Sequence, residues 1–291
     1  MTEKIQNTYC VIGDPIEHSL SPDIHNFVFK ELDLPLRYET VRVPTNRLAL
    51  FVQDCRKMGR PGWNVTIPNK QAIMPFLDEV DPLAKRIGAV NTVVNRNGKL
   101  TGYNTDVDGF RSTLRQSSWS PSLKGKVIVL GAGGAARAVI EGLASMGVHE
   151  VILYDLIVER IKQIQHDFMK LSDLTITIGK LENSDLEKQL AEIDLLVNAT
   201  PVGMWPKENA SPVHCPEQIQ PTATVFDLVY KPVETLLLRQ ARSRGAQTLS
   251  GLTMLTAQAL ASDEIWLERN LPKTLFDKVY QHVFNQMEKN E

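Results

Sequence analysis

Two charged residues in the first third of the chain have side chains that can take part in acid–base chemistry. Lys70 stands just beyond the predicted strand 63–67, and Asp106 ends the segment Gly102-Tyr103-Asn104-Thr105-Asp106. A lysine beside a carboxylate can hold, accept or relay a proton. Each residue also has an ordinary structural explanation, since Lys70 could be a solvated surface lysine and Asp106 a helix N-cap.

Hydroxyl and amide side chains accompany this pair at neighbouring turns and segment ends: Ser19, Ser21, Asn64, Thr66, Asn91 and Thr92. Such groups suit a small polar ligand, because buried polar groups reject an analogue that leaves them unpaired. Alternatively, Ser21 is only an N-cap and Asn91 only satisfies a turn. His18 and His25 flank the serines without a third ligand at zinc-like spacing. We therefore expect no metal, and a place for these histidines on a helix surface or behind the site.

A glycine-rich turn in the middle of the chain predicts a dinucleotide site. The run Gly131-Ala132-Gly133-Gly134-Ala135 follows the apolar segment 127–130 and precedes a helical pattern that begins at Ala136. Gly131 permits a tight turn, Gly133 lets the backbone approach a pyrophosphate, and Ala136 keeps the helix close to the strand. The helix N-terminus offers free N–H groups and a positive dipole end to the phosphates.

Asp155 predicts a preference for NAD. It lies about twenty residues further on, at the end of the next apolar segment. Its carboxylate can accept hydrogen bonds from the ribose hydroxyls, whereas the 2′-phosphate of NADP would meet a like charge there. Arg160 follows one helical turn later, where it could stack on the adenine or reach a 2′-phosphate. Use of NADP therefore stays open, as does a purely structural Asp155 that caps the next helix.

The elements around the first set of residues are predicted from apolar patterning. A helix should begin with Ser21 as its N-cap and Pro22 in its first turn, and Thr45 should cap a second helix. Arg96-Asn97-Gly98 separates two of the predicted strands and is typical of a hairpin with Asn-Gly at its tip. The expected strands are 9–13, 37–43, 63–67, 90–95 and 99–104.

After Asp106 strands and helices alternate, which predicts a doubly wound parallel sheet. Its strands are expected at 127–130, 151–154, 174–178, 195–197 and 224–228. The tail from Leu255 is strongly helical and should pack on the first region. The sequence thus predicts an α/β substrate domain, residues 1–106 completed by C-terminal helices in 255–291, and a Rossmann-type NAD(P) domain, residues 107–254.

Composition excludes several classes of function. A chain of 291 residues is long enough for two domains, and its formal net charge of −2 argues against binding to nucleic acid or a membrane surface. The three cysteines are widely spaced and form no Cys-x-x-Cys pair, so neither a zinc ribbon nor a redox dithiol is indicated. No signal peptide or membrane span is recognisable, and we expect a cytoplasmic protein, with a homodimer compatible with the sequence.

Together these motifs resemble the shikimate dehydrogenase family, including its quinate/shikimate branch, and the resemblance continues through 198–204, 227–230 and 251–258. It implies that Lys70 and Asp106 are catalytic. We take Lys70 as the base and Asp106 as its orienting, proton-sharing partner, although the sequence does not decide between them. The resemblance further implies substrate-binding residues Ser19, Ser21, Thr66, Asn91, Tyr230 and Gln258, and cofactor-side residues Thr200, Val229 and Gly251.

The chain departs from the family where NADP-using members commonly carry Asn-Arg-Thr/Ser, because it has Asp155-Leu156-Ile157 there. We therefore expect an NAD-preferring enzyme that moves a hydride reversibly between NAD(H) and a ring hydroxyl of shikimate or quinate, giving their 3-dehydro forms. An NADP-dependent biosynthetic shikimate dehydrogenase is the alternative. A metabolite-sensing homologue without turnover is disfavoured, because Lys70 and Asp106 are both present.

Overall fold

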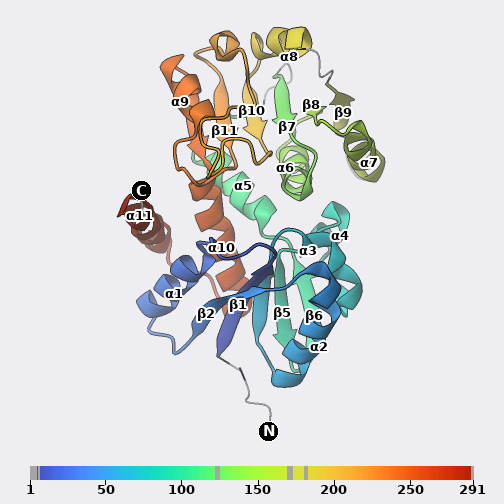
Figure 1. The fold of residues 1–291 in the computed structure, drawn as a ribbon, viewed down its shortest axis with the longest axis vertical. Helices are drawn as coiled ribbons and strands as arrows, with labels where there is room; N and C mark the ends of the chain where they lie inside the picture. The colour runs from blue at the N-terminus through green and yellow to red at the C-terminus, as the bar shows by residue number, and fades with distance from the viewer. Residues whose placement is uncertain (1–4, 6, 122–124, 169–172, 180–182, 290–291) are drawn as a thin grey trace. The chain divides into compact units, whose positions relative to one another are not determined.

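The computed structural model describes residues 5, 7–121, 125–168, 173–179 and 183–289. The chain forms two compact units, Met1–Asp108 with Thr256–Glu291 and Gly109–Leu255. Each unit is built around its own sheet, as the ribbon in Figure 1 shows. The protein is thus an α/β chain with two sheet domains, as the sequence predicts.

The first unit contains a mixed sheet with the strand order β2-β1-β3-β5-β6-β4. Parallel pairing joins β1 to β2 and β3, while β5 runs antiparallel to both β3 and β6. The carboxyl ends of β1, β3 and β6 therefore lie at the same edge as the start of β5. The strands are β1 (Thr8–Gly13), β2 (Arg37–Arg42), β3 (Gly62–Val65), β4 (Glu79–Val80), β5 (Thr92–Arg96) and β6 (Lys99–Tyr103).

The β5–β6 hairpin confirms the prediction made from its turn residues. Asn97 and Gly98 at the tip have φ angles of 54° and 90°, and the flanking residues Arg96 and Lys99 are paired. Positive φ at both central positions is the geometry that an Asn-Gly turn favours. This hairpin fixes where β6 ends, and thus where the polar segment after it begins.

The helices of the first unit begin differently from the prediction. Leu20 is the N-cap of α1 and makes no side-chain capping bond, whereas Ser21 is the first helical residue and is buried. Thr45 lies within the 3₁₀ turn η1 and donates its hydroxyl to Asn69 Oδ1 at 3.0 Å. Both predicted caps are therefore wrong. The helices are α1 (Ser21–Glu31), η1 (Thr45–Arg47), α2 (Leu48–Met58), α3 (Asn69–Ala72), η2 (Met74–Phe76), α4 (Pro82–Ile87) and α11 (Thr274–Lys289).

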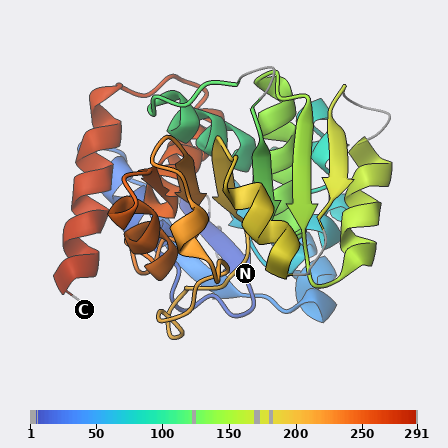
Figure 2. The same ribbon diagram turned by 90° about the horizontal axis from the view of Figure 1, so that it is seen from above.

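The second unit is a Rossmann-type domain with the order β12-β11-β10-β7-β8-β9, all neighbours being parallel. Figure 2 shows the arrows of β7, β8 and β9 pointing the same way. Alternate residues of β7 belong to different cores, Val129 to one and Ile128 to the other, so both faces of the sheet are covered. The strands are β7 (Val127–Leu130), β8 (Glu150–Tyr154), β9 (Thr175–Ile178), β10 (Leu195–Asn198), β11 (Thr224–Asp227) and β12 (Gln247–Ser250).

Two helices contain the unit boundaries, α5 (Asp106–Arg115) and α10 (Gly251–Leu267). The helix α10 begins at Gly251, before the helical start predicted at Leu255. Phe110 of α5 stacks on Phe226 of β11 at 5.4 Å between ring centroids, which anchors α5 in the second core. The other helices of the second unit are α6 (Gly134–Ser145), α7 (Val158–Phe168), α8 (Asn183–Leu190), η3 (Pro216–Gln218) and α9 (Leu236–Ser243).

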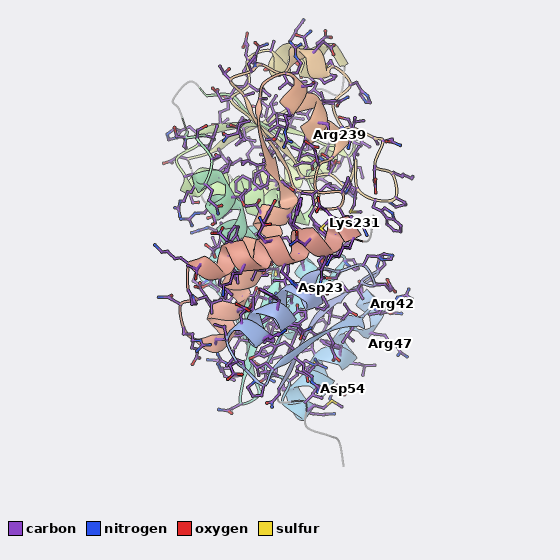
Figure 3. All side chains as sticks on the ribbon, turned by 90° about the vertical axis from the view of Figure 1, so that its left-hand side faces the viewer. Asp23, Arg42, Arg47, Asp54, Lys231 and Arg239 are labelled. Carbon is purple, nitrogen blue, oxygen red and sulfur yellow. The ribbon has the colours of Figure 1, made fainter. Side chains whose placement is uncertain are left out.

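Charges of both signs lie on the surface of the first unit. Arg42, Arg47 and Asp54 are exposed in Figure 3, and the Arg42 guanidinium donates to Asp14 at 2.7 Å. Within the described ranges, no helix has the length and apolar character needed to cross a membrane.

Candidate active site

The candidate acid–base pair forms at the sheet edge of the first unit. Lys70 Nζ donates to Asp106 Oδ2 at 2.5 Å, and the side chains are 18% and 10% exposed. Lys70 lies on α3, just after β3, and Asp106 begins α5, just after β6. Because the carboxyl ends of β3 and β6 meet at one edge, the fold brings together two residues that are 36 positions apart.

Asn91, which immediately precedes β5, holds the other side of the carboxylate. Its Nδ2 donates to Asp106 Oδ1 at 2.9 Å, and its Oδ1 accepts the N–H of Thr105 at 2.8 Å. The Asp106 N–H in turn donates to Asn104 Oδ1 at 3.1 Å. Both carboxylate oxygens of Asp106 therefore have fixed donors, and the carboxylate can orient the Lys70 ammonium.

The other predicted substrate residues of the first unit lie around the same edge. Gln258 of α10 accepts from Asn91 Nδ2 at 3.3 Å. Ser19 accepts the N–H of Ser21 at 3.3 Å, in the turn that follows β1. The half-buried Thr66 follows β3 and packs its methyl against Gly13, where a Cβ would lie only 2.6 Å away. The amide of Asn91 contacts the Lys70–Asp106 pair and Gln258 contacts Asn91, while Ser19 and Thr66 follow strands that end at the same edge of the sheet.

Sequence reasoning missed two residues of the polar network behind this edge. Tyr38 of β2 donates its hydroxyl to Asn64 Oδ1 at 2.5 Å, and Ser262 of α10 accepts from Asn64 Nδ2 at 3.1 Å. Burial raises the pKa of the Tyr38 phenol well above its usual range. The signal for Tyr38 is its place as a buried aromatic residue in a strand whose other residues, apart from Val41, are polar. Ser262 offered no comparable signal.

The glycine turn of the second unit has the shape that a dinucleotide requires. Gly131 has φ +95°, and a Cβ on it would lie 2.9 Å from the Thr200 side chain. At Gly133 and Gly134, a Cβ would meet no described atom within 4 Å. No side chain among the described residues caps the N-terminus of α6. The turn is therefore closed toward the protein and open above the helix N-terminus, so the first N–H groups of α6 fit a pyrophosphate.

Asp155 connects this turn to the loop after β8 by hydrogen bonds. Its Oδ2 accepts the N–H of Ala132 at 2.7 Å and its Oδ1 accepts the N–H of Ile157 at 2.8 Å. Leu156, 87% exposed, lies between these contacts, and Arg160 is exposed in the first turn of α7. The predicted ribose site thus carries a carboxylate with an exposed apolar neighbour and one nearby arginine.

The loops after β10 and β11 are joined by a buried aspartate. Asp227 accepts from the Thr235 hydroxyl at 2.6 Å, from Asn198 Nδ2 at 2.9 Å and from the N–H of Val229 at 3.0 Å. Burial raises the pKa of this carboxyl to about 6, while these three donors oppose the shift. The Thr200 hydroxyl donates to Asn198 Oδ1 at 2.6 Å, so Asp227 organises the segments that carry two predicted cofactor residues.

The remaining predicted residues of the second unit are Tyr230 and Gly251. A Cβ on Gly251 would lie 2.3 Å from the carbonyl oxygen of Leu228, so the start of α10 packs tightly on the loop after β11. Tyr230 is half-buried at the end of that loop, and burial raises the pKa of its phenol. Tyr230 belongs to the second unit, unlike the other predicted substrate residues.

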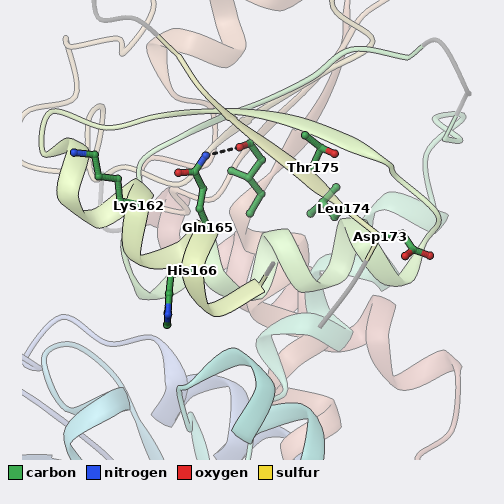
Figure 4. Close-up of a pocket in the computed structure, with 7 residues that line it drawn as sticks. Lys162, Gln165, His166, Asp173, Leu174 and Thr175 are labelled. Atoms are coloured by element: carbon green, nitrogen blue, oxygen red, sulfur yellow. Dashed lines mark hydrogen bonds between the residues drawn. The ribbon is translucent and has the colours of Figure 1, made fainter. Parts of the chain in front are cut away.

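A surface depression elsewhere in the second unit does not match the predictions. It is formed by α7 and the segment that leads into β9, and Figure 4 shows Lys162, Gln165 and His166 along it. Gln165 Nε2 is already bonded to the carbonyl of Ile176 at 2.6 Å, and none of the predicted site residues lines the depression. In the described part of the chain, no three His, Cys, Asp or Glu side chains gather as a metal site.

Comparison with known proteins assigns the chain and its fold to one family. Residues 11–93 match the family model for the shikimate dehydrogenase substrate binding domain. The chain is 41% identical over 256 residues to a shikimate dehydrogenase (NADP(+)) of Desulforamulus reducens, covering 88% of each chain. A shikimate 5-dehydrogenase from Listeria monocytogenes, solved with shikimate and NAD, has a TM-score of 0.87 and 35% identity over 98% of this chain and 99% of its own. A shikimate 5-dehydrogenase from Thermus thermophilus, solved with NADP(H) and shikimate, has a TM-score of 0.83 and 35% identity over 95% and 99%.

Proposed function

The chain belongs to the shikimate dehydrogenase family, and from that premise we propose that it oxidises shikimate reversibly to the 3-dehydro acid. It is an oxidoreductase that acts on a CH–OH group with NAD(P), as its relatives are. The proposed chemistry rests on one observation. Lys70 Nζ contacts Asp106 at 2.5 Å, and the amide of Asn91 holds the same carboxylate.

In the proposed reaction the chain's own residues handle the proton. Lys70 Nζ takes the hydroxyl proton of the substrate while it passes its own proton to the Asp106 carboxylate, which also holds Lys70 in position. Asn91 keeps Asp106 fixed by its 2.9 Å hydrogen bond, so the carboxylate does not reorganise during the reaction. Ser19, Ser21, Thr66, Gln258 and Tyr230 bind the other polar groups of the acid.

A bound nicotinamide dinucleotide would supply the acceptor for the hydride, which leaves the carbon whose hydroxyl group gives up the proton. The glycine turn and the first N–H groups of α6 would hold its pyrophosphate, because the turn leaves space above Gly133 and Gly134. Asp155 and Arg160 would flank the adenosine ribose. Thr200, Val229 and Gly251 belong to the segments that would face the nicotinamide.

We propose NADP as the working cofactor, because the curated relative is named for NADP(+) and a similar structure was solved with NADP(H). These names favour the alternative over the NAD preference expected from the sequence. Arg160, exposed in the first turn of α7, is then the partner of the 2′-phosphate. Use of NAD is a second candidate, favoured by the Asp155 carboxylate and by the Listeria monocytogenes structure solved with NAD.

Steady-state kinetics with each acid and each dinucleotide tests this proposal. We expect a higher kcat/KM for shikimate than for quinate, and a higher kcat/KM with NADP than with NAD. A higher kcat/KM with NAD would contradict the cofactor assignment and support the second candidate. Turnover of quinate alone would contradict the choice of substrate.

A further inference from the structure

A histidine and an aspartate that take no part in the proposed chemistry are buried together in the first unit. His25 Nδ1 lies 2.8 Å from Asp263 Oδ1, and both side chains are 0% exposed. His25 belongs to α1 and Asp263 to α10. The option of a helix-surface place for His25 is therefore wrong, because the buried face of α1 carries it beside Ile24 and Phe29.

The two helices that this pair joins each carry predicted substrate residues. Ser21 lies one turn before His25 on the same buried face of α1. On α10, Gln258 and Ser262 precede Asp263, and Ser262 Oγ donates to the Gln258 carbonyl at 3.0 Å. A hydrogen bond between His25 and Asp263 therefore limits how α1 can slide or rotate against α10.

His25 also orders the network behind the predicted substrate residues. Its ring stacks on Tyr38, with centroids 4.2 Å apart and planes inclined by 18°. Tyr38 donates to Asn64 Oδ1 at 2.5 Å. Asn64 Nδ2 then donates to Ser262 at 3.1 Å, which closes a ring of contacts beside Asp263.

Stability alone does not account for this pair. Among the described residues, His25 Nε2 and Asp263 Oδ2 have no hydrogen-bond partner, although both atoms are buried. Buried polar atoms without partners are unfavourable, and apolar residues of similar volume often replace a buried ion pair without loss of stability. A buried pair with two unpartnered polar atoms is better explained by the geometry that it imposes on α1 and α10.

We propose that the His25–Asp263 pair is a positioning device that fixes α1 against α10 and so holds Ser21 and Gln258 at the spacing that binds the polyhydroxy acid. This role rests on the proposed function. Both residues act through others, and neither is assigned contact with substrate or cofactor. Their loss should therefore weaken the binding of the acid and leave the binding of the dinucleotide intact.

The test compares two variants of the full chain by KM and by melting temperature. The double variant His25→Phe/Asp263→Leu keeps a ring on Tyr38 and leaves no unpaired buried charge, so it should fold. We expect its KM for shikimate to rise about tenfold, as small misplacements of binding groups do, with KM for the dinucleotide unchanged. The single variant Asp263→Asn keeps an acceptor for His25 Nδ1, so its KM for shikimate should equal that of the wild type.

Arg60→Met is the matched control, because Arg60 is a buried charge of the same unit that pairs with Glu39 at 2.8 Å. It should lower the melting temperature without changing KM for shikimate. A wild-type KM for shikimate in the double variant would overturn the proposal, as would an equal rise in KM for the dinucleotide. A raised KM for shikimate in Asp263→Asn would also overturn it, because charge and not geometry would then be required. Absence of shikimate turnover in the wild type would instead contradict the proposed function itself.

Discussion

Asn91 Nδ2 donates to Asp106 Oδ1 at 2.9 Å, on the carboxylate oxygen that Lys70 leaves free. The carboxylate is thus held from both sides, by an amide at the start of β5 and by an ammonium on α3. This arrangement fixes the position of Lys70 Nζ before any substrate binds.

Removal of the Lys70 amine should abolish most of the turnover. We expect Lys70→Ala to lower kcat by about two orders of magnitude or more, which is the usual contribution of a positioned general base. Lys57→Ala, at an exposed lysine on α2, is the control and should keep wild-type kcat. Steady-state assays that find near-wild-type kcat in Lys70→Ala would remove Lys70 from the mechanism.

Two alanine substitutions in the glycine turn should separate folding from cofactor binding. Gly131→Ala forces a side chain onto φ +95° and against Thr200, so we expect it to lower the free energy of unfolding by at least about 1 kcal/mol. Gly133→Ala meets no described atom, so its melting temperature should not change. Its methyl group would occupy the approach to the pyrophosphate, so KM for the dinucleotide should rise. An unchanged KM in Gly133→Ala would mean that the pyrophosphate lies elsewhere.

Substitution of Asp155 should change the choice of dinucleotide. Asp155→Asn removes a charge that repels the 2′-phosphate, so we expect the ratio of kcat/KM for NADP to that for NAD to rise about tenfold, as for a surface charge contact of about 1 kcal/mol or more. The amide keeps only one acceptor for the N–H groups of Ala132 and Ile157, so the melting temperature is measured in parallel. Glu159→Gln, at an exposed neighbour, is the control. A ratio that stays the same in Asp155→Asn would show that this carboxylate does not discriminate between dinucleotides.

The buried Asp227 should make stability depend on pH. Its folded-state pKa is about 6 against an ordinary value of 3.8, so the folded protein binds a proton that the unfolded chain releases. The stabilising contribution is therefore present below about pH 4 and is lost as the pH rises through about 6. The free energy of unfolding of the wild type, relative to Asp227→Asn, should fall by about 3 kcal/mol over this interval.

Chemical denaturation at several pH values measures this difference. Asp54→Asn, at an exposed carboxylate, supplies the background slope. A wild-type protein that becomes more stable relative to Asp227→Asn as the pH rises would contradict the raised pKa of Asp227.

Much of the fold follows from local patterns. The Asn97-Gly98 hairpin, the strand–turn–helix unit at Gly131 and the alternation after Asp106 each contain their signal within a few residues. The edge strand β12 was not predicted, since Gln247–Ser250 contains few apolar residues, and β4 spans only Glu79–Val80. Short or polar edge strands are defined by the neighbour with which they pair, so their own sequence is a weak guide.

The residues of the candidate site also differ in whether the local sequence predicts them. The sequence motifs identify Lys70 and Asp106, and the structure places them in contact, while their roles stay predictions. The burial of His25 could be expected from the spacing of Ser21, Ile24 and Phe29 on one helical face, although its partner Asp263 lies 238 residues away and has no local signal. The sequence predicts Ser21 as an N-cap because capping is a common local use of serine, but Ser21 is a buried residue of α1 and Leu20 is the N-cap.

One isotope experiment tests directly whether this chain removes a hydride from shikimate. Shikimate deuterated at the carbon that becomes the carbonyl is incubated with the enzyme and oxidised dinucleotide, and the reduced dinucleotide is analysed by mass spectrometry. We expect the deuterium to appear in the reduced dinucleotide, and Lys70→Ala to form this product far more slowly. Shikimate that binds without any transfer of deuterium to the dinucleotide would contradict the proposed oxidation.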